Sequence, residues 1–132
     1  MTDRLETIAQ VPLFSALSKR HLRRILRGMV SYEYKEGRTI VRQGDPGETL
    51  FVVLEGEARV VRSGRTLSRL HSGDFFGEIA VFDKRPRTAS VVADSPVRCL
   101  VLHRVELRKM LADEPRAAWV LLGVLAARLR GD

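Results

Sequence analysis

Two charged residues stand in a segment that is otherwise mostly apolar. In FFGEIAVFDKRPRTASVV, residues 75–92, Glu78 directly follows Gly77 and Arg87 comes nine residues later. An unpaired buried charge costs on the order of several kcal/mol, so three interpretations compete. The two residues pair with each other or with other protein groups, they lie on the surface, or they face a cavity that holds a polar ligand.

The residue types around Glu78 favour a ligand. Gly77 lets the backbone approach a bound molecule closely, and the N–H groups of Ile79 and Ala80 would point outward from a helix N-terminus, which is an anion site. The Glu78 carboxylate only accepts hydrogen bonds, so it selects a hydroxyl or an amine, whereas the planar fork of Arg87 suits a phosphate. A ligand with one anionic group beside one hydroxyl satisfies both residues, which indicates a sugar phosphate or a nucleotide.

The elements that must position these residues are short strands. Between residues 30 and 103, short β-type runs such as EARVVR and RTLSRL partly alternate between apolar and polar residues, as half-buried strands do. DSP at 94–96 separates the two last runs, TASVVA and VRCLVL, in which Cys99 is expected to pack as a small apolar residue. The other turns are expected at Gly37, Gly44, Gly47, Gly56, Gly64 and Gly73. Many short strands without βαβ alternation predict an antiparallel sandwich or barrel.

Helical patterns flank the strands on both sides. Residues 13–29 are expected to form one helix, with Ser18 as a plausible N-cap, Gly28 at its C-terminal side, and an arginine face that suits either an acidic partner or plain solvent. A short helix is predicted in RVELRKMLADEP and a longer one over 116–130, beginning near Asp113 and Pro115. In the longer helix, Gly123 indicates a close contact or a mobile point. Its apolar stripe is Trp119, Leu122, Leu125 and Leu129.

The segment SGDFFGEIAVFDKRPRTASVVA, residues 72–93, closely resembles the phosphate-binding cassette of the cyclic nucleotide-binding domain family. VPLFSALSKRHLRRI is similar to the helical lead-in of that family, YKEGRTIVRQGDPGETLFVVLEGEARV to its early strands, and VRCLVLHRVELRKML to its last strand and following helix. The resemblance implies a mainly β fold, an antiparallel β jelly roll (double-stranded β-helix) with flanking helices. It also implies one domain over residues 1–132, divided into a helical lead-in (1–29), a β-roll (30–103) and C-terminal helices (104–130).

The resemblance also implies roles for individual residues. Glu78 would accept a hydrogen bond from the ribose 2′-OH, and Arg87, rather than the competing cation Arg85, would pair with the cyclic phosphate. The backbone of Gly77, Ile79 and Ala80 would cradle that phosphate, with Thr88 beside phosphate or base. The expected ligand-binding set is Phe76, Gly77, Glu78, Ile79, Ala80, Arg87, Thr88 and Ala89, and the base contacts are assigned to Val61, Leu70, Trp119 and Leu122, with ordinary helix packing as the alternative role of Trp119.

The ligand implied is cAMP or cGMP, with no further cofactor. A threonine after the arginine favours cGMP in some relatives, yet other members with this threonine respond better to cAMP, and cAMP is preferred here. Binding would bias the position of the C-terminal helices, around a hinge in HRVELRKMLADEP, and so regulate an unidentified protein effector. The last helix is expected to cover the pocket, to form a homodimer, or both.

The composition of the chain bears on the other classes of protein to which it could belong. The net charge is +7 with arginines scattered along the sequence, which suits anionic partners or simply a solvated surface. One cysteine and three dispersed histidines, His21, His71 and His103, predict no disulfide and no metal site, and no nucleophile–base pair indicates an enzyme. We expect a cytoplasmic sensor without a transmembrane segment or a helix-turn-helix, either standing alone or cut from a longer chain. The alternative is an interaction module that keeps the fold but has lost nucleotide binding.

Overall fold

The computed structural model describes residues 4–15, 17–77 and 85–131 of the chain. These residues form two compact units: a helical unit from residues 1–28 and 105–132, and a β unit from residues 29–104. The predicted strand region, 30–103, therefore matches the β unit closely.

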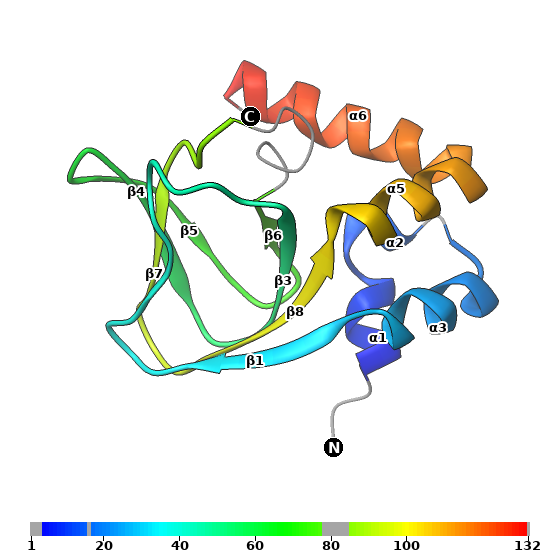
Figure 1. The fold of residues 1–132 in the computed structure, drawn as a ribbon, viewed down its shortest axis with the longest axis horizontal. Helices are drawn as coiled ribbons and strands as arrows, with labels where there is room; N and C mark the ends of the chain where they lie inside the picture. Colours follow the sequence, from blue (N-terminus) through cyan, green and yellow to red (C-terminus); the bar gives the residue numbers. More distant parts are fainter. Residues whose placement is uncertain (1–3, 16, 78–84, 132) are drawn as a thin grey trace. The chain divides into compact units, whose positions relative to one another are not determined.

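The β unit consists of two four-stranded antiparallel sheets (Figure 1). The first has the order β1-β8-β3-β6, and the second has the order β2-β7-β4-β5. This arrangement agrees with the predicted jelly roll. The strands are β1 (Val30–Tyr34), β2 (Thr39–Val41), β3 (Thr49–Glu55), β4 (Ala58–Arg62), β5 (Arg65–Leu70), β6 (Phe75–Phe76), β7 (Ser90–Ala93) and β8 (Val97–His103).

The turns between strands lie where glycine and small polar residues predict them. The β4–β5 hairpin turns at Ser63 and Gly64, whose φ angles are 50° and 80°. Two successive positive φ values are typical of the tight hairpin turn that matches strand twist. The predicted DSP turn connects β7 to β8, and Asp94 there accepts hydrogen bonds from the side chains of Arg59 and Arg69.

An apolar core lies between the two sheets. Phe51, Val53, Phe76, Val97 and Cys99 come from the first sheet. Ala58, Leu70, Val91 and Ala93 come from the second. Cys99 is fully buried, which confirms its predicted packing, and burial raises the pKa of its thiol to about 12.

The helical unit contains α1 (Arg4–Ala9), α2 (Pro12–Ser15), α3 (Lys19–Arg27), α5 (Arg104–Asp113) and α6 (Pro115–Arg130). The predicted single helix over 13–29 is wrong, because the chain leaves the helical conformation at Leu17 and Ser18. Ser18 instead caps α3, since its hydroxyl accepts a hydrogen bond from the His21 N–H. Gly28 ends the same helix as predicted.

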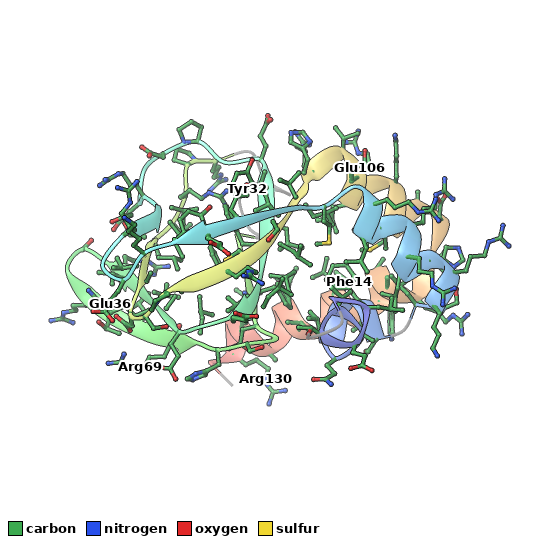
Figure 2. The ribbon with its side chains drawn as sticks, turned by 90° about the horizontal axis from the view of Figure 1, so that it is seen from below. Phe14, Tyr32, Glu36, Arg69, Glu106 and Arg130 are labelled. Carbon is green, nitrogen blue, oxygen red and sulfur yellow. The ribbon has the colours of Figure 1, made fainter. Side chains whose placement is uncertain are left out.

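Helix α6 begins at Pro115, as the sequence predicts, and its buried side chains are Ala117 and Leu121. The predicted stripe does not supply these buried residues: Trp119, Leu122 and Leu129 are 78%, 59% and 89% exposed. Helix α2, whose Phe14 is fully buried (Figure 2), packs against α6. No helix in the described ranges is long and apolar enough to cross a bilayer.

Candidate functional site

Arg87 is buried in the β unit although its side chain carries a charge. Its exposed fraction is 7%, and it is the one charged side chain that is buried among residues 4–15, 17–77 and 85–131. Its main chain is fixed to the loop between β2 and β3. The Arg87 N–H donates to the Asp45 carbonyl at 2.8 Å, and the Gly44 N–H donates to the Arg87 carbonyl at 2.9 Å.

The guanidinium of Arg87 is oriented by neutral oxygen atoms and by an aromatic ring. Nη1 donates to the Gly77 carbonyl at 3.2 Å, and Nη2 lies 3.2 Å from both the carbonyl and the hydroxyl of Thr49. The guanidinium carbon lies 5.7 Å from the ring centroid of Phe51, within the range of a cation–π contact. Phe51 in turn stacks on Phe76, with ring centroids 4.8 Å apart. These contacts hold the guanidinium in place.

Two glycines lie directly against the same guanidinium. A Cβ atom at Gly47 would lie 2.1 Å from Nε of Arg87, and one at Gly77 would lie 2.6 Å from Nη1 and 2.8 Å from the Thr49 carbonyl. Gly77 also has a φ of 90°, which disfavours any residue with a side chain. Both positions therefore require glycine if Arg87 is to keep this position.

Sequence reasoning found Arg87 and Gly77 but missed three of their neighbours. Gly47 was expected only as a turn residue, and Thr49 and Phe51 only as strand residues. The signal that could have found Gly47 and Thr49 is the small, polar stretch GDPGET, residues 44–49, directly before the apolar run LFVVL, residues 50–54.

The other predicted ligand residues have different surroundings. Glu78, Ile79 and Ala80 lie outside the described residues. Phe76 is 5% exposed in the core, Ala89 is half-buried, and Thr88 is exposed, its carbonyl accepting a hydrogen bond from Nε of Arg62 at 3.0 Å. Arg85 is exposed whereas Arg87 is buried, and this contrast supports the choice of Arg87. The roles of all these residues toward a ligand stay predictions.

The four predicted base contacts are divided between the two units. Val61 is half-buried on β4, and Leu70 on β5 is 7% exposed within the core between the sheets. Trp119 and Leu122 are exposed on α6, so ordinary helix packing, the alternative for Trp119, does not describe its surroundings. Contact of any of the four with a base stays a prediction.

The histidines and the cysteine offer separate, unconnected environments. Each histidine lies beside one glutamate: His21 is 3.0 Å from Glu114, His71 is 3.6 Å from Glu57, and His103 is 3.3 Å from Glu48. Within the described ranges, no group of three or more His, Cys, Asp and Glu side chains could hold a metal ion. Arg87, by contrast, presents an oriented guanidinium, which is a group suited to binding an anion.

Comparison with known proteins gives consistent matches along the chain. A sequence model described as the cyclic nucleotide-binding domain matches residues 32–114. A CRP-like cAMP-activated global transcriptional regulator of Mycobacterium tuberculosis is 31% identical over 130 residues, which cover 95% of this chain and 58% of that protein. The chain thus spans little more than half the length of this relative.

Solved structures of related proteins also match most of the chain. A cyclic nucleotide-binding domain from Methylobacillus flagellatus aligns with a TM-score of 0.85 and 30% identity, covering 96% of this chain and 79% of that one. The catabolite activator protein of Thermus thermophilus aligns with a TM-score of 0.84 and 34% identity, covering 91% of this chain and 59% of that one. These matches are to nucleotide-binding and regulatory proteins, and they give no positive support for catalysis.

Proposed function

The chain belongs to the cyclic nucleotide-binding domain family, and we propose that its β unit binds a cyclic nucleotide, with cAMP preferred to cGMP. The observation that carries this proposal is the buried guanidinium of Arg87, held between Gly47 and Gly77. The planar fork of donors that a guanidinium presents suits the oxygen atoms of a cyclic phosphate. A guanidinium that is already oriented also loses little conformational freedom when the ligand binds.

The remaining parts of the nucleotide are assigned to residues of the same cassette. Glu78 accepts a hydrogen bond from the ribose 2′-OH, and the backbone N–H groups of Ile79 and Ala80 donate to the phosphate. Thr88 lies beside the phosphate or the base. Together these residues would distinguish a cyclic nucleotide from a simple phosphate, because only the nucleotide presents a hydroxyl to Glu78.

The description of one relative supports the proposed preference for cAMP. The Mycobacterium tuberculosis regulator, which matches nearly the whole of this chain, is described as cAMP-activated. Thr88 is the residue that could oppose this preference, since its hydroxyl can donate to or accept from a guanine edge. Comparing the affinities of Thr88→Ala for the two nucleotides would show whether the hydroxyl contributes to cGMP binding alone.

We propose further that binding regulates an effector through the helices α5 and α6. A ligand shifts an equilibrium between two arrangements only by its difference in affinity for them. A tenfold difference corresponds to about 1.4 kcal/mol. The exposed apolar side chains Trp119, Leu122 and Leu129 are available to cover a bound base or to meet a second copy of α6.

Isothermal titration calorimetry with cAMP, cGMP and 5′-AMP tests the proposed function. The wild-type chain should bind at least one of the two cyclic nucleotides, and bind it more tightly than 5′-AMP. Arg87→Ala should weaken that binding by about 2–5 kcal/mol, the usual cost of truncating one partner of a buried charge pair. A folded wild-type chain that binds neither cyclic nucleotide would instead support the alternative, an interaction module without a ligand.

A further inference from the structure

The positive charge of this protein is concentrated in the helical unit. That unit, residues 1–28 and 105–132, contains 11 of the 23 Lys and Arg residues but only six of the 16 Asp and Glu residues, so it carries +5 of the net charge of +7. The β unit, which is longer, carries only +2. The arginines themselves are divided almost evenly, nine in the helical unit and ten in the β unit, so the excess charge of the helical unit arises because it has few acidic residues.

Helix α3 presents four of these arginines on one side. Arg20, Arg23, Arg24 and Arg27, here called the arginine stripe, are all exposed. At about 100° per residue, the four positions fall within an arc of roughly 100° and extend about 10 Å along the helix axis. The stripe is therefore compact, with neighbouring guanidinium groups at the i, i+3 and i, i+4 spacings.

The opposite side of α3 is already occupied within the helical unit. Leu22 is buried at 3% exposure, and Nδ1 of His21 lies 2.8 Å from the Ser18 hydroxyl and 3.0 Å from a Glu114 carboxylate oxygen. With this side packed, α3 has a fixed orientation and the stripe faces solvent. Like charges at i, i+3 and i, i+4 destabilise a helix, so an anionic partner would relieve a repulsion that the isolated chain retains.

We propose that the arginine stripe is a docking surface for an acidic segment of a protein. Its length matches about two turns of a helix whose glutamates or aspartates repeat at i, i+3, i+4 and i+7, and guanidinium forks bind carboxylates in pairs. Four cations are fewer than the roughly six to ten phosphate contacts of a typical DNA-binding surface. The buried apolar side of α3 also removes the face that an interfacial membrane helix would insert.

One residue of the stripe connects this surface to the junction of α5 and α6. Nη1 of Arg24 lies 3.8 Å from a carboxylate oxygen of Asp113, the last residue of α5, and both side chains are more than half exposed. An acidic segment that binds Arg24 therefore competes with Asp113 for the same guanidinium. Docking on the stripe would in this way be sensitive to the arrangement of the α5–α6 junction.

Fluorescence anisotropy tests the proposal directly. The probe is a fluorescein-labelled glutamate–alanine helical peptide with glutamates at i, i+3, i+4 and i+7, titrated with the full chain at low and at physiological salt. The test variant is R20Q/R23Q/R27Q, which leaves the Arg24–Asp113 pair intact. The matched control is R38Q/R42Q/R65Q, which removes the same charge from exposed positions of the β unit. Circular dichroism checks that both variants fold.

The stripe variant should bind the peptide about tenfold more weakly than the wild type, if each exposed ion pair contributes a factor of about two. The control should stay within about twofold of the wild type, because net charge acts only weakly through salt. Equal losses in the two variants, or no binding by the wild type at low salt, would overturn the proposal. Tighter binding of a DNA oligonucleotide of equal charge, or of phosphatidylserine vesicles, would overturn the assignment to an acidic protein.

Discussion

The two units of this chain use arginine in opposite ways. In the β unit, Arg87 is 7% exposed and its guanidinium is fixed by Thr49, Gly77 and the ring of Phe51. In the helical unit, the four arginines of the stripe are exposed, and Arg24 meets only a solvated aspartate at 3.8 Å. A buried, oriented cation can select the shape of one small anion, whereas exposed cations act mainly through screened charge.

Arg87 should therefore recognise its partner mainly through geometry, and the stripe should recognise its partner mainly through charge. Interactions at the buried arginine should depend on single atoms, because Gly47, Gly77 and Thr49 lie directly against its guanidinium. Interactions at the stripe should depend on how many charges are present and on the salt concentration. Variants that change one atom in the β unit, or that change the solvent, therefore test the comparison.

The largest effect is expected from Gly47→Ala. The added Cβ would lie 2.1 Å from Nε of Arg87, so the guanidinium must move out of its position. We expect cyclic nucleotide affinity to fall by about 2–5 kcal/mol, as for the loss of a buried charged partner, with no change in acidic-peptide binding at the stripe. Calorimetry and anisotropy on the same protein check both expectations, and wild-type nucleotide affinity in this variant would contradict the tight fit around Arg87.

A second test of the β unit is whether water is excluded from Cys99, which alkaline pH should reveal. Burial raises the pKa of this thiol from 9.0 to about 12, so the folded state keeps its proton where the unfolded chain loses it. The stability from this group is present below pH 9 and is lost as the pH rises toward 12, by about 1.4 kcal/mol per pH unit.

Denaturant unfolding of the wild type and of Cys99→Ala across this pH range isolates the effect. The pKa of Tyr34 is also raised, first by burial and second by the nearby Cys99. The part due to burial is common to both proteins and cancels in the comparison, whereas the part due to Cys99 is removed together with the thiol. The alanine variant should lose less stability between pH 9 and pH 11 than the wild type does. Parallel pH profiles for the two proteins would mean that water reaches Cys99.

A smaller effect is expected from removing one hydroxyl at Thr49. Thr49→Val keeps the shape of the side chain but loses the Oγ1 atom that lies 3.2 Å from Nη2 of Arg87. The hydroxyl helps to orient the guanidinium, so cyclic nucleotide should bind about tenfold more weakly, in line with about 1.5 kcal/mol for a hydrogen bond to a charged group. Thr49→Ser restores the hydroxyl and should restore the affinity; equal weakening in both variants would assign the effect to packing instead.

The smallest effect is expected in the helical unit, where there is space for a side chain at Gly123. A Cβ at Gly123 of α6 would meet nothing within 4 Å among the described residues, so no close contact within this chain requires a glycine there. Gly123→Ala should stabilise the chain by up to about 1 kcal/mol through helix propensity, seen as a higher midpoint in urea unfolding. A lower midpoint would show that this glycine is needed for a bend or for a contact.

Local patterns predicted the elements better than the contacts between them. The strand region, the start of α6 at Pro115 and the turns at Gly37, Gly44, Gly56, Gly64 and Gly73 depend on nearby residues, and these predictions are confirmed. Gly47, the other predicted turn residue, does not lie in a turn. The Ser18 cap was recognised, but the break that it imposes on the 13–29 helix was not, because a continuing helical apolar pattern hid it. On α6, periodicity alone could not show that Ala117 and Leu121 would be the buried positions.

In the candidate site too, local patterns in the sequence identified residues but not their distant contacts. Arg87 and Gly77 were identified because they lie in one short segment whose residue types are unusual. Thr49 lies 38 residues before Arg87, and Gly47 and Phe51 lie 40 and 36 residues before it, so no local pattern connects them to the arginine. Antiparallel pairing of β3 with β6 and the loop bonds to Asp45 bring these residues together, and such long-range contacts follow only from the tertiary fold.

The most direct test of the central claim is calorimetric titration of Arg87→Lys with cAMP. This substitution keeps the charge but replaces the planar fork, with its bonds to Thr49 and Gly77, by a single ammonium group. If geometry at the buried site controls recognition, the variant should bind cAMP at least tenfold more weakly than the wild type, while R20Q/R23Q/R27Q stays within about twofold. Wild-type affinity in Arg87→Lys, or an equal loss in the stripe variant, would contradict the account.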